Sequence, residues 1–198
     1  MPQKLNLGCF NRPAREWINT DITPHIWIAR VPSAAGVIRA LGRMTAERLQ
    51  EHKMGIFRRV RSLNVTKRFP FPDDSTTAVY TSHMLEHLYP WDAEKCLAEC
   101  LRILAPQGVL RIAVPDLDQI VSAFEKDSPH PFLDDVYAYG HGMAKNSHRW
   151  HYNFCSLSRL LTSLGFPTVQ RCEYQSGRCP DLESIEHRPE SLFVEAIK

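Results

Sequence analysis

The sequence predicts an α/β protein with a mainly parallel sheet. Short apolar or alternating runs typical of strands recur along the chain, and several are separated by stretches with the apolar spacing of a helix. Five of the strand-like runs are followed by polar or glycine residues. In a parallel sheet such ends meet at one edge, where ligands bind. These ends carry Gly8, Asp21, Asn64, Ser82 with His83, and Pro115 with Asp116.

The bulk composition predicts one ordinary globular domain spanning residues 1–198. The chain is 43% hydrophobic and 23% charged, and its formal net charge is +2. That charge is too close to zero to predict nucleic-acid binding, so we expect no nucleic-acid partner. A basic cluster does occur, and it is either a solvated face or a patch for an anionic substrate or membrane surface. It comprises Arg58, Arg59, Arg61, Lys67 and Arg68.

The six cysteines and the absence of long apolar runs favour a cytoplasmic, reduced protein. No run of 18 apolar residues occurs, and the first ten residues do not resemble a signal peptide. We therefore expect no transmembrane segment. Cys96 and Cys100 are four apart on an expected helix and share a face, either as buried thiols or as zinc ligands.

The first elements are two strands, over residues 4–8 and 16–22, the second of which is stopped by Pro24. The link between them is too short for a normal helical crossover between parallel strands. Either the crossover has collapsed to a turn, or the two strands are not both parallel.

A helical insertion is expected at about residues 25–57, because residues 33–55 have helical apolar spacing with a break at Gly42 or Thr45. Strands over 58–65 and 78–82 follow. The run 91–104 predicts a helix that ends at Pro106 and Gly108, and the next apolar run predicts a strand over 109–114.

The last third begins with a helix over 116–126, with acidic residues in its first turn. Residues 128–153 are rich in proline, glycine, histidine and aromatic residues, and predict an irregular, lid-like segment. A helix over 156–166 and two closing strands, over 167–174 and 190–198, complete the domain.

The residues at the first two strand ends favour a nucleoside cofactor without a pyrophosphate. Gly8 allows close backbone approach, and Asp21 can accept hydrogen bonds from a ribose diol. A dinucleotide fingerprint would need three spaced glycines with an acid about 20 residues further on, and neither is present.

These motifs resemble a class I S-adenosylmethionine-dependent methyltransferase, of a branch similar to enzymes encoded beside bacterial glycan-synthesis genes. The matching stretches cover nearly the whole chain, and it is their order that makes them specific. They are "LNLGC" (5–9), "EWINTDI" (16–22), "FPFPDDS" (69–75), "VYTSHMLEHL" (79–88), "LRILAPQGVLRIAVPDL" (101–117), "HRWHYN" (148–153) and "SLFVEAIK" (191–198).

The resemblance implies a Rossmann-like, doubly wound sheet with an antiparallel C-terminal strand, and S-adenosyl-L-methionine as cofactor. It implies methyl transfer to a small-molecule or saccharide acceptor, which we expect to be at oxygen. The methionine moiety would lie near Gly8, Ser82 and His83, the ribose on Asp21, and adenine beside Asn64 and Val65. The full expected cofactor set is Gly8, Cys9, Phe10, Asp21, Ile22, Asn64, Val65, Ser82 and His83.

Three departures from the branch pattern bear on this expectation. Phe10 stands where the general family has a second glycine, and would crowd the methionine end. Asn64 stands where an aspartate usually accepts from adenine; it would either read adenine through its carbonyl or only cap a turn. Ala105 and Gln107 alter a turn that in the branch reads Lys-Pro-Gly-Gly.

Histidines are the expected acid–base groups, because methyl transfer to a hydroxyl benefits from a base and imidazole titrates in the right range. The candidates are His148, which is preferred, and His87. Each could instead be a structural histidine, and we predict no metal site.

The main alternative to an enzyme is a non-catalytic protein of the same fold that serves as a binding or scaffold partner, for which Phe10 and Asn64 are the arguments. A nicotinamide oxidoreductase is disfavoured by the missing glycines. A homo-oligomer is compatible with the sequence, which does not decide the oligomeric state.

Overall fold

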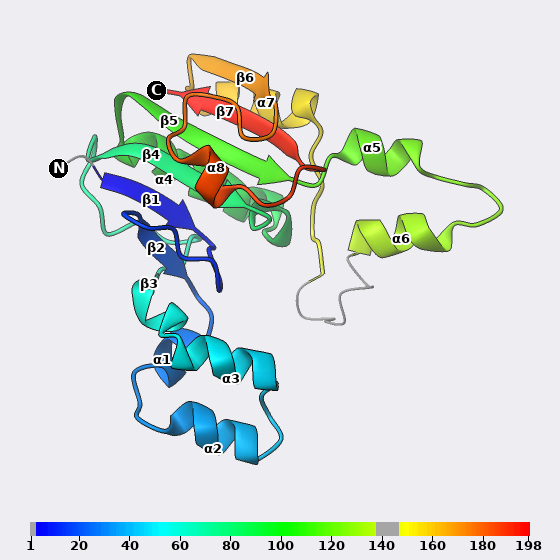
Figure 1. Cartoon of the computed structure of the whole chain (residues 1–198). Helices are drawn as coiled ribbons and strands as arrows, with labels where there is room; N and C mark the ends of the chain where they lie inside the picture. Colours follow the sequence, from blue (N-terminus) through cyan, green and yellow to red (C-terminus); the bar gives the residue numbers. More distant parts are fainter. Residues whose placement is uncertain (1–2, 138–146) are drawn as a thin grey trace.

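The computed structural model describes residues 3–137 and 147–198, which form a single seven-stranded sheet with helices around it (Figure 1). The strand order is β3-β2-β1-β4-β5-β7-β6. Only β7 is antiparallel to its neighbours, so the predicted fold class is confirmed. The strands are β1 (Gln3–Leu7), β2 (Ile18–Asp21), β3 (Val60–Ser62), β4 (Thr76–Ser82), β5 (Leu104–Val114), β6 (Thr168–Cys172) and β7 (Leu192–Ile197).

The helices divide into those that cover the sheet and those that extend from its edge. In Figure 1, α1 to α3 lie below β3, while α5 and α6 project beyond the end of β5. The helical elements are α1 (His25–Ile28), α2 (Ala34–Ala40), α3 (Ala46–Lys53), η1 (Ile56–Arg59), η2 (Leu85–His87), α4 (Pro90–Ile103), α5 (Leu117–Ser122), α6 (His130–Tyr137), α7 (Phe154–Ser163) and α8 (Leu182–Ile185).

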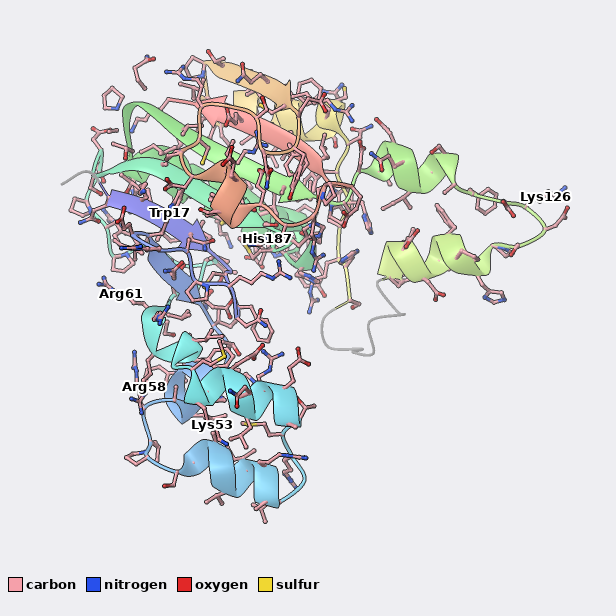
Figure 2. The ribbon with its side chains drawn as sticks, in the orientation of Figure 1. Trp17, Lys53, Arg58, Arg61, Lys126 and His187 are labelled. Atoms are coloured by element: carbon pink, nitrogen blue, oxygen red, sulfur yellow. The ribbon has the colours of Figure 1, made fainter. Side chains whose placement is uncertain are left out.

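The two faces of the sheet are covered very differently. Behind the sheet, α4 and α7 bury an extended core that includes Leu97, Leu157 and Leu161. α4 contributes one apolar stripe, in which the free thiols of Cys96 and Cys100 are buried. In front, the short helix α8 and two loops cover a smaller cluster around Trp17 and Tyr80 (Figure 2). The front face is therefore covered mostly by irregular chain.

The link between β1 and β2 is a loop without a helix, although the two strands are parallel. Of the two alternatives for this link, the collapsed crossover is the one found. The Asn19 side chain stabilises the loop, because it accepts from the Ala14 backbone N–H and donates to the Ala14 carbonyl. Trp17, at the end of the loop, fills the place over the front face that a crossover helix would occupy, and its indole N–H donates to Asp181.

Three helices were not predicted individually, because their sequence signals are weak. α1 and α8 are single turns of four residues. α6 lies inside the segment 128–153 that was predicted to be irregular, and that part of the prediction is wrong. Prolines beside its first turn suit a helix start, because the first N–H groups have no partner within the helix. Residues 138–146 of the predicted lid lie outside the described residues.

The predicted long helix over 33–55 is divided into α2 and α3, and the break lies in the expected Gly42–Thr45 stretch. Thr45 caps α3 by accepting from the Arg48 backbone N–H. The predicted strand over 58–65 is shorter than expected: residues 58–59 belong to the 3₁₀ turn η1, and residues 63–65 follow the strand in irregular chain.

Arg102 on α4 holds the loop before β4 in place. Its guanidinium donates to the carbonyls of Phe69 and Phe71 and to the carboxylates of Glu99 and Asp73.

Replacing Arg102 with methionine should lower the free energy of unfolding by about 2 kcal/mol, because two carbonyls and two carboxylates lose a charged donor. Urea denaturation would measure the loss. The same substitution at exposed Arg61 on β3 (Figure 2) should cost under about 0.5 kcal/mol, and an equal loss at both positions would contradict the assignment.

Candidate functional site

A cavity of about 680 Å³ opens at the carboxyl ends of β1, β2 and β4. It is the edge that the sequence predicted for a ligand, since parallel strands bring their ends together there. All nine residues of the expected cofactor set line it, and His87 lines it as well. The structure thus brings together residues 8–10, 21–22, 64–65 and 82–83.

Gly8 forms the turn after β1, with φ +67°, a conformation that L side chains rarely adopt. A Cβ at this position would lie 2.5 Å from Cγ of Met84, so the turn packs tightly against the segment that follows β4. The next residue, Cys9, is buried, and burial raises the pKa of its thiol to about 12. The part of this cavity formed by the Gly8 backbone and the Cys9 thiol is therefore uncharged.

The Asp21 carboxylate, at the end of β2, is fixed by two backbone donors. Its Oδ2 accepts from the Phe10 N–H at 2.9 Å, and its Oδ1 accepts from the Thr23 N–H at 2.7 Å. A carboxylate has about four lone-pair sites, so two remain for a ligand in the cavity. Asp21 therefore both shapes the Gly8 turn and presents an acceptor to the cavity.

Phe10 replaces the second glycine of the general pattern and has φ +46°. Its ring packs on the helical insertion (about residues 25–57). The ring centroid lies 6.1 Å from that of Phe57 and 6.4 Å from that of His25. The Arg48 guanidinium lies 4.5 Å from the Phe10 ring centroid. Phe10 thus attaches the loop after β1 to the helical insertion, a role that the sequence pattern did not indicate.

Asn64 forms a local turn with Thr66. Its side-chain oxygen accepts from both the backbone N–H and the hydroxyl of Thr66, each at 2.9 Å. An amide oxygen has two lone pairs, and both are engaged. Of the two expectations for Asn64, this geometry favours the turn cap and leaves only the amide N–H groups for adenine.

We expect Asn64→Ala to lower the melting temperature while the affinity for S-adenosylhomocysteine stays within about threefold of the original. The reason is that the substitution removes the cap of the turn. Differential scanning fluorimetry and calorimetry on the same preparation would measure both quantities. A much larger loss of affinity with an unchanged melting temperature would assign Asn64 to adenine recognition.

A second cavity, of about 540 Å³, adjoins the first. His83, His87 and Arg188 line both cavities, so these side chains lie at their junction. The rest of its wall includes residues of α5, Asp134 and Asp135 of α6, and His148. Two adjoining cavities with a shared wall are what a reaction between two bound molecules requires.

Residues that no motif indicated complete both cavities. Ile185 and His187 line the first cavity, Glu190 and Ser191 line the second, and Arg188 lines both. Ile185 ends α8 and the other four belong to the stretch between α8 and β7, and Figure 2 shows His187 near the end of the sheet. Strand order alone could not have placed them, because this stretch returns over the front face without a regular element of its own.

Glu86 lies buried at the base of the second cavity, with none of its surface exposed. His83 Nδ1 lies 3.2 Å from its Oε1, and His148 Nε2 lies 4.0 Å from the same oxygen. Burial alone would raise the pKa of this carboxyl group, but the facing imidazoles of His83 and His87 outweigh it and hold the pKa below its usual value. We therefore treat Glu86 as ionised.

The two expected catalytic histidines lie beside this carboxylate. The ring centroids of His87 and His148 are 5.1 Å apart, and those of His148 and His151 are 5.0 Å apart. Burial, partly offset by the nearby Glu86, lowers the pKa of His148 to about 4, so its imidazole is neutral near pH 7 and keeps a free lone pair. The structure thus places His87 and His148 in one cluster, facing the second cavity.

The comparisons with known proteins agree with this geometry. The family described as a methyltransferase domain matches residues 38–112. A probable S-adenosylmethionine-dependent methyltransferase of Mycobacterium tuberculosis is 28% identical over 128 residues, which are 64% of this chain and 39% of that protein. One from Mycolicibacterium smegmatis is 31% identical over 98 residues, 49% of this chain and 31% of that protein.

Solved structures show the same fold. A S-adenosylmethionine-dependent methyltransferase from Archaeoglobus fulgidus superimposes with a TM-score of 0.58 at 17% identity, over 100% of this chain and 86% of that one. One from Mesorhizobium loti does so with a TM-score of 0.54 at 17% identity, over 99% and 90%. The chain therefore has the fold of class I S-adenosylmethionine-dependent methyltransferases, and its residues 38–112 match the methyltransferase-domain family.

The family match and the names of these relatives indicate S-adenosylmethionine as the cofactor. The family match begins within α2 and ends in β5, so the Gly8 turn and Asp21 lie outside it. The aligned part of the chain spans about two fifths of the length of the M. tuberculosis relative. Among the described residues of the methyltransferase domain, no helix has the length and apolar character needed to cross a membrane.

Proposed function

We propose that this methyltransferase moves the methyl group of S-adenosylmethionine to a hydroxyl of a neutral small molecule or saccharide. The observation that carries the proposal is the pair of adjoining cavities whose common wall is His83, His87 and Arg188. The first cavity would hold the cofactor, and the second the acceptor. Its reactive oxygen would then approach the sulfonium methyl across the junction, where positioning supplies much of the acceleration.

The lining of the second cavity supports a neutral, hydroxyl-rich acceptor. It contains five carboxylates and one arginine, an excess of negative charge that disfavours phosphorylated or acidic acceptors. Carboxylates also accept hydrogen bonds well from hydroxyl groups. The acidic side chains are Glu86, Asp116, Asp134, Asp135 and Glu190, and the arginine is Arg188.

The roles of single residues in this proposal follow from their positions. Gly8, Cys9 and Phe10 would line the methionine end of the cofactor together with Ser82 and His83. Asp21 and Ile22 would meet the ribose, and Asn64 and Val65 would lie beside adenine. His148, with His87 next to it, would receive the proton of the acceptor hydroxyl.

We also propose that residues 1–198 form one domain, in which the helical insertion at about 25–57 and the segment 128–153 are parts of the same unit. Asp134, Asp135 and His148 from that segment support its role as a wall of the acceptor cavity.

We further propose that the protein works in the cytoplasm. All six cysteines are free thiols, a state that a reducing compartment maintains.

A panel of acceptors tests the reaction. The protein is incubated with S-adenosylmethionine and, separately, with neutral glycosides, sugar phosphates and primary amines, and S-adenosylhomocysteine is quantified by mass spectrometry. We expect product with neutral glycosides and little with sugar phosphates. Methylated amines without methylated glycosides would overturn transfer to oxygen. Tight cofactor binding with no turnover on any acceptor would favour the non-catalytic alternative.

Asp21→Ala should weaken the binding of S-adenosylhomocysteine by about 1.5–3 kcal/mol, or roughly 10- to 150-fold, because the ribose loses a charged acceptor. Calorimetry would measure the affinity, and circular dichroism would show that the variant is folded. Asp21→Asn keeps one acceptor oxygen and should lose less. Unchanged affinity in a folded Asp21→Ala variant would remove Asp21 from the cofactor site.

A further inference from the structure

The buried Glu86 carboxylate lacks the partners that such a group needs. Its side chain is 1% exposed, and neither of its oxygens has a hydrogen-bond partner among residues 3–137 and 147–198. The nearby His83 nitrogen is close enough for an ion pair but is not aligned for a hydrogen bond. An unsatisfied buried carboxylate costs several kcal/mol, so a native fold keeps one where something else binds it.

Imidazole nitrogens surround this carboxylate at distances that fit a metal centre. Glu86, His87 and His148 each offer one ligand atom, and these three atoms lie within 4.8 Å of one another. Bonds of 2.0–2.2 Å to a common ion would bring them to roughly 3–3.5 Å apart. Small side-chain rotations, of about 1 Å at the donor atoms, would close that difference.

The contacts of the two histidines leave lone pairs available. Nδ1 of His87 faces the Ser147 carbonyl at 3.4 Å, the outer contact that metal-binding histidines commonly make, and it directs the lone pair to Nε2. Nδ1 of His148 is buried and has no hydrogen-bond partner among the described residues. The backbone N–H groups of Arg149 and Trp150 donate to the Glu86 carbonyl, which holds the His148 segment against η2.

We propose that Glu86, His87 and His148 bind one divalent transition-metal ion at the base of the acceptor cavity, with His83 beside it. Two imidazoles and one carboxylate suit Zn²⁺, Fe²⁺, Co²⁺ or Mn²⁺ better than Mg²⁺ or Ca²⁺, which prefer oxygen ligands throughout. The acidic cavity lining raises the local concentration of cations. His87 and His148 line the cavity, so the open coordination positions would face the acceptor.

The binding of the ion stands on the cluster alone, whereas its role rests on the proposed function. There the acceptor hydroxyl would bind the ion, which lowers the pKa of its proton. The O–H bond breaks and the proton leaves to water. The oxygen electron pair then forms the bond to the methyl carbon while the carbon–sulfur bond breaks, which releases S-adenosylhomocysteine. His148 would then bind the ion instead of receiving the proton.

Direct titration with Co²⁺ tests the site without cofactor or acceptor. The full chain is treated with EDTA, dialysed and titrated with Co²⁺, with calorimetry and visible absorption as readouts. We expect one ion per chain in the wild type. Glu86→Gln and His148→Gln should each weaken binding at least about tenfold. His52→Gln should bind like the wild type, because His52 belongs to a separate histidine pair in which Nδ1 of His25 and Nε2 of His52 lie 2.9 Å apart.

Stability measurements guard against misfolded variants. Without metal, Glu86→Gln should melt close to the wild-type temperature, because the amide has the size of the carboxylate and the substitution removes both the cost of burying the charge and its attraction to the neighbouring imidazoles. Saturating Co²⁺ should raise the wild-type melting temperature and leave that of Glu86→Gln unchanged. This pattern, together with the titrations, supports the site.

Any other pattern overturns the site: no stoichiometric binding, binding unaffected in both variants, or binding lost in His52→Gln. Failure of the proposed function is a separate result, in which Co²⁺ binds as described but no acceptor is methylated by the metal-loaded protein. Methylation by EDTA-treated protein that does not bind Co²⁺ would overturn the metal site alone.

Discussion

Arg111→Met should lower the free energy of unfolding by about 3–5 kcal/mol, because it removes the only arginine between two buried carboxylates. Arg111, Glu186 and Glu195 have fully buried side chains. The guanidinium donates to both oxygens of Glu186, at 2.7 and 3.1 Å, and its third nitrogen lies 3.6 Å from Glu195. Without it, the negative charge of Glu186 would stay buried without a cation.

The same guanidinium also fastens the chain that covers the front of the sheet. It donates to the carbonyls of Glu173 and Ser176, and Glu195 accepts from the backbone N–H groups of Arg178 and Cys179. This chain continues into Ile185, His187 and Arg188, which line the cofactor cavity. We therefore expect the Arg111→Met variant to bind S-adenosylhomocysteine more weakly as well, although Arg111 does not line that cavity.

Chemical denaturation would measure the loss, and Arg15→Met is the matched control. Arg15 has the same side chain and also faces a glutamate, but its side chain is 95% exposed and the pair is 4.0 Å apart. Its loss should be under about 0.5 kcal/mol. If Arg111→Met cost as little as the control, the buried ion pairs would not be what holds the front cover.

His148→Ala should lower turnover by about 100-fold or more, while the affinity for S-adenosylhomocysteine stays within about twofold. His148 lines the acceptor cavity and does not line the cofactor cavity, so its loss should affect the chemical step and not cofactor binding. Its neutral imidazole offers a lone pair either to the acceptor proton or to an ion held with Glu86. Both roles predict the same loss, and the Co²⁺ titration separates them.

Single-turnover kinetics with an accepted glycoside, together with calorimetry, would test this expectation. The control is His130→Ala, at an exposed position on α6, which should behave like the wild type. Turnover unaffected by His148→Ala would make His148 a structural histidine. Equal losses of turnover and cofactor affinity would mean that the substitution had disturbed the junction of the two cavities.

The parallel half of the sheet and the edge at which the cavity opens could be predicted because their signals are local. A strand ends where apolar residues give way to a glycine or a polar residue, as at Gly8, Asp21 and Ser82. Once the strands are known to be parallel, those ends must meet. The helix α4 was predictable for the same reason, since its apolar stripe is continuous.

The rest depends on contacts between residues far apart in the chain, which no local pattern contains. Glu86 stood out only as part of the stretch 79–88, but the fold buries it beside His148, 62 positions later. The carboxylate–histidine cluster, and with it the case for a metal, exists only in three dimensions. The role of Arg188 escaped notice because charged residues in an apparent loop usually face solvent. The buried Arg111 pairs escaped notice because they join Arg111 to glutamates far along the chain.

The front cover of the sheet has a consequence for biosynthesis. Trp17 and Lys4 both contact Asp181, which is translated 164 and 177 residues after them. Until that part of the chain leaves the ribosome, the apolar front of β1 and β4 lacks the cover of α8, and the cavity at the carboxyl edge of the sheet lacks one wall. After β4 has been made and before α8 follows, the nascent polypeptide would therefore expose an apolar sheet surface and could not complete the cavity. Such an intermediate is the kind that chaperones recognise.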